Sequence, residues 1–225
     1  TGDIEYSYGN AAEVFRNAAK QTKKIVSAGA IPFTLGGDHS ISSAPLAEVS
    51  KVHGPVSLLQ FDAHADTGSG PKIQHGTMFK IAADSRTINP ATSFQIGLRT
   101  PFNSTLDFNT ITAVEAIYQS SKILSQRIET VIGKSACYIS IDIDCLDPSY
   151  APGTGTPIPG GLTTLQLLEI LRGLSGTKLN IVGLDLVEVA PDYDHAQITS
   201  LAAAQICQES LCLISNTKPQ HKKPI

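Results

Sequence analysis

Three short segments of the sequence carry carboxylates and imidazoles at alternating positions. These segments are residues 36–39 (GGDH), 62–66 (DAHAD) and 142–144 (DID). Each follows an apolar run, and side chains at alternate positions of a strand point to the same face. Oxygen and nitrogen ligands without cysteine suit two neighbouring divalent metal ions. The first hypothesis is therefore a hydrolase with a binuclear metal centre.

The charges of these segments also favour two metal ions. Asp62, Asp66, Asp142 and Asp144 carry four negative charges when ionised, which two divalent cations would neutralise. Without a cation, two carboxylates about 4 Å apart repel by ~4 kcal/mol at an effective dielectric constant near 20. A water shared by two such ions loses a proton near neutral pH and becomes a nucleophile. Oxygen-rich ligands with only two imidazoles favour Mn²⁺ over Zn²⁺.

Each segment alone also has an ordinary structural explanation. A single histidine such as His39 more often forms a hydrogen bond or a cap than it binds a metal, and aspartates that follow a strand often stabilise turns. The combination favours a metal site, because buried carboxylates are costly unless they are paired or bound to metal.

Composition and charge limit the class of protein. The chain has 225 residues, of which 41% are hydrophobic and 16% charged, which fits one large α/β domain. A net charge of −3 gives no reason to expect nucleic acid or an anionic membrane as partner. No apolar stretch approaches the ~20 residues that span a bilayer. Four cysteines without metal or redox spacing indicate reduced thiols in a reducing compartment. We expect the cytoplasm, and organellar targeting stays open because the sequence begins at Thr1.

The elements that must position these segments alternate between strand and helix patterns. Apolar strands with little alternation indicate a mostly parallel sheet that helices cover on both faces, a three-layer α/β/α fold. Ligands in such folds bind beyond the carboxyl ends of the strands, where all three segments lie. We expect one domain over residues 1–215 and a flexible tail over 216–225. The expected strands are 31–35, 55–61, 93–98, 137–143 and 179–187, and the expected helices are 11–28, 40–52, 77–83, 121–133, 165–174 and 196–214.

Seven longer motifs make the chain similar to the ureohydrolase family, which includes arginase and agmatinase. The resemblance extends from about Gly2 to Ile214 and implies an arginase-like fold and a homo-oligomer, a trimer or hexamer. HGTMF and VEVAPDYD are closer to agmatinases and related guanidino-acid hydrolases than to arginases. The motifs are LGGDHS (35–40), FDAHADT (61–67), HGTMF (75–79), QIGLRT (95–100), SIDIDCLDP (140–148), APGTGTPIPGGLT (151–163) and DLVEVAPDYD (185–194).

The resemblance implies two Mn²⁺ ions per subunit. Asp62 and Asp142 would bridge the ions, and Asp66 would also orient the hydroxide between them. The ligands of one ion would be His39, Asp62, Asp66 and Asp142, and those of the other would be Asp62, His64, Asp142 and Asp144.

The resemblance also implies residues for the substrate and for catalysis. Glu188 would hold the guanidinium, Thr156 would support it, and His75 would transfer protons or help to bind the substrate. A carboxylate can pair with a planar guanidinium through two hydrogen bonds, and Glu188 follows an expected strand. The ordinary alternatives are a solvated acid for Glu188, a loop histidine for His75 and a turn residue for Thr156. Asp66, His75 and Glu188 are thus the candidate catalytic residues.

The expected reaction is hydrolysis of a small cationic guanidino compound, agmatine first, to an amine (putrescine) and urea. A guanidino acid such as guanidinobutyrate, or arginine, is the alternative substrate. A metal-binding but inactive homologue with an assembly or regulatory role is the alternative of another class. Family members usually carry an N-terminal segment before the region that matches Gly2, and without it the sheet would have an open edge. Asp192 and Asp194 are candidates for the mouth of the pocket or for plain turn roles.

Overall fold

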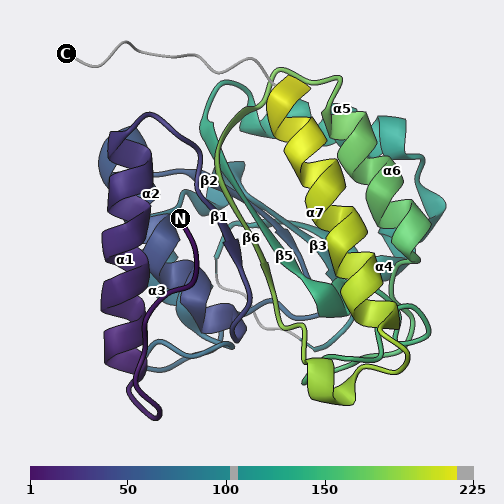
Figure 1. Ribbon diagram of the computed structural model, residues 1–225. Helices are drawn as coiled ribbons and strands as arrows, with labels where there is room; N and C mark the ends of the chain where they lie inside the picture. Colours follow the sequence, from purple (N-terminus) through teal and green to yellow (C-terminus); the bar gives the residue numbers. More distant parts are fainter. Residues whose placement is uncertain (102–105, 217–225) are drawn as a thin grey trace.

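The computed structural model describes residues 1–101 and 106–216, and its centre is a six-stranded parallel sheet (Figure 1). The strand order is β1-β6-β5-β2-β3-β4, and every registered pair is parallel. The expected sheet is therefore confirmed. The strands are β1 (Phe33–Leu35), β2 (Ser57–Phe61), β3 (Phe94–Leu98), β4 (Asn109–Thr112), β5 (Ala136–Asp142) and β6 (Asn180–Val187).

Helices cover both faces of the sheet, which confirms the three-layer architecture. One layer holds α1, α2 and α3, and the other holds α4, α5, α6 and α7 (Figure 1). The larger hydrophobic core lies between the sheet and the second layer. The helices are α1 (Ala11–Ser27), α2 (Ser43–His53), α3 (Met78–Asp84), α4 (Ala113–Tyr118), α5 (Ser121–Ile132), α6 (Thr164–Leu174) and α7 (Ile198–Asn216).

Local sequence explains the position of these elements. Helix α6 begins with a capping box, in which Thr163 and Gln166 bond reciprocally through side chain and backbone. Its buried leucines are spaced to face the sheet, as an amphipathic helix requires. Strands β2 and β3 are buried at all five positions, as parallel strands between two helix layers must be.

The strand order creates a topological switch point between β2 and β5. The chain leaves β2 towards β3 on one side and leaves β5 towards β6 on the other. Crevices outside the carboxyl ends of strands at such points are where ligands bind in open α/β sheets. Asp62 follows β2 directly, and Asp142 is the last residue of β5.

The structure differs from the sequence-based expectations at several places. Strand β4 and helix α4 were not expected, because both are short and β4 has the polar sequence NTIT at a sheet edge. The expected helix over 40–52 begins as a 3₁₀ turn, η1 (His39–Ser42), before α2. Residue 143 belongs to a second 3₁₀ turn, η3 (Ile143–Cys145), rather than to the strand.

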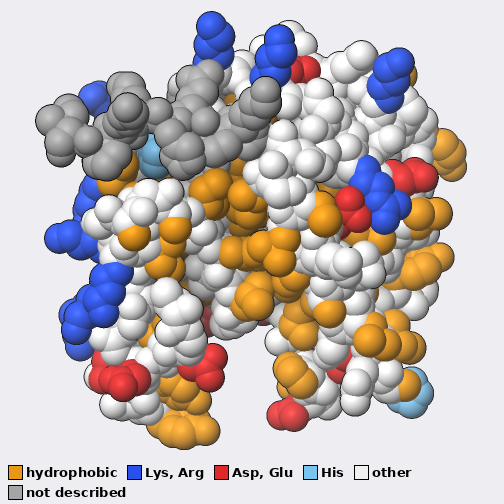
Figure 2. All heavy atoms as spheres, turned by 45° about the horizontal axis from the view of Figure 1, so that its top comes forward, with side chains coloured by type: hydrophobic (Ala, Val, Ile, Leu, Met, Phe, Trp, Pro, Cys, Tyr) orange, Lys and Arg blue, Asp and Glu red, His pale blue; other side chains and the backbone are white. Residues whose placement is uncertain are grey.

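Among the described residues, β1 forms one edge of the sheet and β4 forms the other. Only three residues of the expected strand 31–35 pair with β6, and Leu35 is 63% exposed. Figure 2 shows hydrophobic side chains gathered across the middle of one face. The exposed hydrophobic residues of the chain also include Leu201 and Leu211 of α7.

Helix α7 corrects the expectation that no apolar stretch has the length of a membrane span. The helix has 19 residues, and the mean hydropathy over a window of 18 residues is 1.2. By length and composition alone, it could therefore cross a membrane. The core helix of a globular protein also passes this test, and α7 places Ala202, Ile206 and Leu213 in the core beside the sheet. Helix α7 extends two residues beyond its expected end, and the rest of the expected tail lies outside the described residues.

All four cysteines are free, as expected.

Candidate functional site

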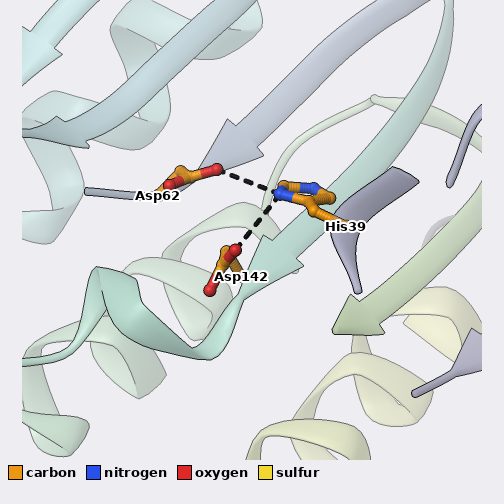
Figure 3. A group of neighbouring side chains, drawn as sticks. All are labelled: His39, Asp62 and Asp142. Atoms are coloured by element: carbon orange, nitrogen blue, oxygen red, sulfur yellow. Dashed lines mark ion pairs between the residues drawn. The ribbon is translucent and has the colours of Figure 1, made fainter. Parts of the chain in front are cut away.

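Three carboxylates surround one nitrogen of His39 at the switch point. Nδ1 of His39 lies 3.1 Å from Oδ2 of Asp62, 2.9 Å from Oδ2 of Asp66 and 3.2 Å from Oδ2 of Asp142. Figure 3 shows His39, Asp62 and Asp142 pointing towards one another; His39 begins η1, Asp62 follows β2, and Asp142 ends β5. The ring of His39 also packs edge-on against Phe79, with 5.2 Å between ring centroids.

A second group of ligand atoms shares Asp62 with the first. Nδ1 of His64 lies 2.9 Å from Oδ2 of Asp144 and 3.5 Å from Oδ1 of Asp62. The two groups that could each hold a metal ion are therefore His39, Asp62 and Asp142, and Asp62, His64 and Asp144. All six expected ligands thus meet in one place. Asp142 is grouped with His39, and it joins the second group only through its bond to the Asp144 N–H.

The contacts of His39 fit a divalent cation better than a hydrogen-bond network. One ring nitrogen can donate one proton, yet three oxygens approach Nδ1, which has no aligned hydrogen-bond partner. Octahedral ions with bonds of about 2.1 Å place neighbouring ligand atoms about 3 Å apart, which matches these distances. The mainly oxygen donor set is of the kind that Mg²⁺, Ca²⁺ and Mn²⁺ prefer.

The protonation behaviour of the cluster reflects an excess of negative charge. Burial and the charge of Asp62 raise the pKa of Asp66 to about 7. Burial also raises the pKa of Asp142, and the charges of Asp62 and Asp144 add to this shift. Burial beside neighbouring carboxylates therefore disfavours the ionised forms of Asp66 and Asp142. A divalent cation would offset this repulsion.

The two histidines respond to the same charges. Hydrogen bonds to Asp144 and Asp62 raise the pKa of His64 to about 10. Burial alone would lower the pKa of His39, but Asp142, Asp62 and Asp66 raise it well above its ordinary value. Both imidazoles therefore lie in a field that attracts positive charge, whether the charge is a proton or a metal ion.

Backbone hydrogen bonds fix the ligand-bearing turns to each other. Oδ1 of Asp62 accepts from the N–H of His64 at 2.6 Å, and Oδ1 of Asp144 accepts from the N–H of Ala63 at 3.0 Å. The second bond joins the turn after β2 to the turn after β5. The remaining carboxylate oxygens can then point towards the histidines without rearrangement.

Two candidate catalytic residues adopt strained backbone conformations. Asp66 has a φ of 53° and Glu188 a φ of 64°, both in the left-handed region that non-glycine residues rarely occupy. Such conformations cost roughly 1–3 kcal/mol each and cluster at functional sites. In Glu188 the turn directs the side chain away from the line of β6 and back towards His39.

Glu188 is attached to the metal-binding segment by its side chain and by its backbone. Its Oε1 accepts a hydrogen bond of 2.7 Å from the N–H of His39, and its own N–H donates to the carbonyl of Gly37 at 3.0 Å. Burial raises the pKa of Glu188, and the hydrogen bond from His39 opposes this shift. The expected guanidinium-binding carboxylate therefore lies directly beside the candidate metal ligands.

The loop that contains Thr156 packs against both parts of the site. Thr156 is exposed, and its hydroxyl donates to Oδ2 of Asp144 at 3.2 Å. A Cβ added at Gly153 would lie 2.7 Å from Cβ of Asp194, so only glycine allows this loop to approach the segment after β6. The carbonyl of Gly153 accepts from the N–H of Ala190 at 2.8 Å.

The other expected residues have different positions. His75 is exposed in the turn before α3, and its charge contributes to lowering the pKa of Glu188. Asp194 serves a structural role, because its carboxylate accepts from the N–H groups of Thr199 and Ser200 in the first turn of α7. Asp192 is exposed in a 3₁₀ turn.

A row of buried polar residues that leads to the candidate metal ligands was not predicted. Gln95, Gln60, Ser140 and Asp185 are consecutive partners in register across β3, β2, β5 and β6, and each is 0% exposed. Gln60 donates to Oδ2 of Asp62 at 2.7 Å, and Gln95 donates to Oε1 of Gln60 at 2.7 Å. A signal was present, because each residue is a polar interruption in an otherwise apolar strand.

Arg99 lies in the motif QIGLRT (95–100), and the sequence predicted no role for it. Its guanidinium donates to carbonyl groups on both sides of the Asp144 turn, among them those of Asp144 at 2.6 Å and Ile158 at 2.7 Å. It therefore joins the turn that carries a metal-ligand candidate to the loop that carries Thr156.

Comparison with known proteins identifies similar sequences and folds. A sequence model described as the Arginase family matches residues 1–212. An agmatinase of Neisseria meningitidis serogroup C is 43% identical over 213 residues, which cover 94% of this chain and 69% of that protein. The similarity thus includes the whole site and most of the described fold.

Solved structures resemble this chain closely. A hypothetical agmatinase from Burkholderia thailandensis has a TM-score of 0.90 and 40% identity, covering 94% of this chain and 67% of that chain. The proclavaminate amidino hydrolase from Streptomyces clavuligerus has a TM-score of 0.89 and 34% identity, covering 96% of this chain and 75% of that chain. The expected arginase-like fold is confirmed.

Proposed function

Since the chain belongs to the arginase family and is a hydrolase of guanidino carbon–nitrogen bonds, we propose that it hydrolyses agmatine to putrescine and urea at a two-manganese site. The observation that carries the proposal is the hydrogen bond of 2.7 Å between Oε1 of Glu188 and the N–H of His39. It places a carboxylate suited to guanidinium beside a cluster suited to divalent cations. The agmatinase of Neisseria meningitidis supports the choice of agmatine.

We assign the cations to the residues that converge at the switch point. His39, Asp62, Asp66 and Asp142 would hold one ion, and Asp62, His64, Asp142 and Asp144 would hold the other. When bound, the two ions would polarise a water molecule and so supply the nucleophile. Mn²⁺ is preferred to Zn²⁺ because carboxylate oxygens outnumber imidazoles in this set.

Glu188 would bind and orient the substrate. Its Oε1 is held by the His39 N–H, and its Oε2 lies on the side of Gly155, 3.8 Å from where a Cβ of that residue would be. An ionised carboxylate there would pair with two N–H groups of the planar guanidinium and direct its carbon towards the cluster. Thr156 would support this arrangement from the neighbouring loop.

The remaining residues would move the protons that the reaction requires. Water oxygen forms a bond to the guanidino carbon, and the bond to the alkyl-bearing nitrogen breaks. That nitrogen takes a proton and leaves as the amine, while urea retains the new carbon–oxygen bond. Asp66, whose Oδ2 lies 2.9 Å from Nδ1 of His39 within the cluster, is the first candidate to accept a proton from water and pass it on. His75 at the exposed side of the site is the second candidate for this transfer.

A substrate panel with urea as the readout tests the assignment. We expect Mn²⁺-loaded protein to release urea from agmatine with a higher kcat/KM than from guanidinobutyrate or arginine. A preference for guanidinobutyrate or arginine would move the chain to the alternative substrate class and overturn the agmatine assignment. Metal binding without urea release from any of the three would support the inactive homologue. The expected trimer or hexamer remains a prediction that sedimentation can test.

A further inference from the structure

A chain of hydrogen bonds leads from His39 into the centre of the sheet. Nε2 of His39 lies 2.8 Å from Oγ of Ser140, which donates to Oδ1 of Asp185 at 2.6 Å. The hydroxyl of Tyr138 donates to Oδ2 of the same carboxylate at 2.7 Å. No side chain in this chain of bonds is more than 1% exposed. Asp185 is therefore a buried carboxylate that Ser140 links by hydrogen bonds to the ring of His39.

The single proton of Ser140 determines which nitrogen of His39 is protonated. A serine hydroxyl has one proton to donate and lone pairs that accept. Because Ser140 gives its proton to Asp185, it can only accept from His39, so Nε2 carries the ring proton. The lone pair of the neutral ring is then on Nδ1, the atom that the three carboxylates surround.

We propose that Asp185 is a positioning residue that acts through Ser140 to hold His39 in the tautomer and orientation in which Nδ1 binds metal. The proposal rests on the proposed metal centre and deepens it. Histidines that bind metals usually donate their other N–H to a carboxylate, carbonyl or water, which fixes the ring and its tautomer. Here a serine hydroxyl is placed between the histidine and the carboxylate.

The surrounding packing supports a role beyond filling space. A buried carboxylate is costly, and Asp185 lies between apolar neighbours on a strand that is buried from Ile181 to Val187. Gly183 leaves space for Tyr138, the second hydrogen-bond partner of Asp185. A Cβ added at Gly183 would lie 2.6 Å from the Tyr138 ring. Replacing Asp185 and both hydroxyls by apolar groups would remove this desolvation cost, so their presence at the metal site calls for a function.

Two variants separate this role from general stabilisation. Ser140→Ala and Tyr138→Phe each remove one hydroxyl that bonds to Asp185, but only Ser140 lies between Asp185 and His39. Loss of the outer partner of a metal-binding histidine typically weakens metal affinity about 10–100-fold. We expect such a loss of Mn²⁺ affinity for Ser140→Ala and a change within about threefold for Tyr138→Phe. The affinity is measured by titrating Mn²⁺ into chelator-treated protein and following the free ion by electron paramagnetic resonance.

Equal losses in both variants, or unchanged affinity in Ser140→Ala, would overturn the proposal. A second measurement on the wild-type chain covers the case in which Ser140→Ala does not fold. In ¹⁵N NMR spectra of protein loaded with diamagnetic Zn²⁺, we expect His39 to carry its proton on Nε2. The opposite tautomer would overturn the proposal. Both readouts report on metal binding alone, so a lack of urea release would count against the proposed function without deciding this inference.

Discussion

The carboxylate of Glu188 accepts a hydrogen bond of 2.7 Å from the backbone N–H of His39, although 149 positions separate the two residues in the sequence. The left-handed backbone of Glu188 and its bond to Gly37 hold the side chain in this direction. In the proposed function, this residue pair would join substrate recognition to metal binding. A change at Glu188 can alter recognition without removing any of the atoms that surround Nδ1 of His39.

Replacing Glu188 by glutamine should separate these two tasks. Glutamine keeps an oxygen that accepts from the His39 N–H but removes the negative charge that attracts guanidinium. Hydrogen bonds to charged groups contribute about 1.5–3 kcal/mol each, so losing one acceptor oxygen together with the charge should lower kcat/KM for agmatine about 10–100-fold. The Mn²⁺ content, measured by elemental analysis, should stay at the wild-type level. Asp192→Asn removes an exposed carboxylate nearby and should leave both quantities within about twofold. Loss of metal in Glu188→Gln would show that the assigned role is wrong.

Asp194 provides a test of stability that does not involve the metal ligands. Its carboxylate accepts from two N–H groups in the first turn of α7, and replacing such a capping residue by alanine costs about 1 kcal/mol. Burial would raise the pKa of Asp194, but hydrogen bonds from Thr199 and Ser200 lower it to about 2. In the unfolded chain the pKa of an aspartate is about 3.9. The stabilisation by ionised Asp194 is therefore complete above about pH 3.9 and is lost as the pH falls towards about 2.

Urea-induced unfolding of wild type and Asp194→Ala at pH 7 and pH 3 measures this effect. The difference in free energy of unfolding should be smaller at pH 3 than at pH 7. Asp192→Ala should show little difference at either pH, because Asp192 is exposed in the preceding 3₁₀ turn. A difference for Asp194→Ala that is the same at both pH values would contradict the capping role.

Gly183 is expected to be intolerant of even a methyl group. A Cβ at this position would lie 2.6 Å from the ring of Tyr138, which is fully buried. Overpacking a core in this way typically costs about 1–3 kcal/mol, so Gly183→Ala should lower the midpoint of urea unfolding clearly. At Gly176 the nearest atom would be 3.6 Å away, an ordinary contact, and Gly176→Ala should change stability by less than ~0.5 kcal/mol. Equal stability of the two variants would show that the Tyr138 ring can move.

The sequence was sufficient to predict that the six candidate metal ligands lie together, because strand periodicity and strand ends are local signals. Alternating ligands after apolar runs placed Asp62 and Asp142 at the carboxyl ends of strands, and the structure has both at the switch point. The edge strand β4 was missed because a short polar sequence that pairs on one side has no clear pattern. Its pairing with β3 decides its conformation, and that contact is not local.

The supporting residues of the site were harder to predict for the same reason. Ser140 and Asp185 are single polar residues in apolar strands, and their meaning depends on a register that brings them opposite each other. The partner of Glu188 is a backbone N–H, which has no sequence signature at all. For Asp194 the sequence is compatible with both the mouth of a pocket and a turn, and its two capping hydrogen bonds are visible only in three dimensions.

The most direct test of the central claim is the dependence of urea release from agmatine on bound Mn²⁺. Chelator-treated protein is titrated with Mn²⁺ while urea production and bound metal are measured on the same samples. The account predicts negligible urea without metal and activity that reaches a plateau near two Mn²⁺ per chain, the number that the two ligand groups around Asp62 suit. Full activity in the chelated protein, or folded protein that binds two Mn²⁺ and releases no urea from agmatine, would contradict it.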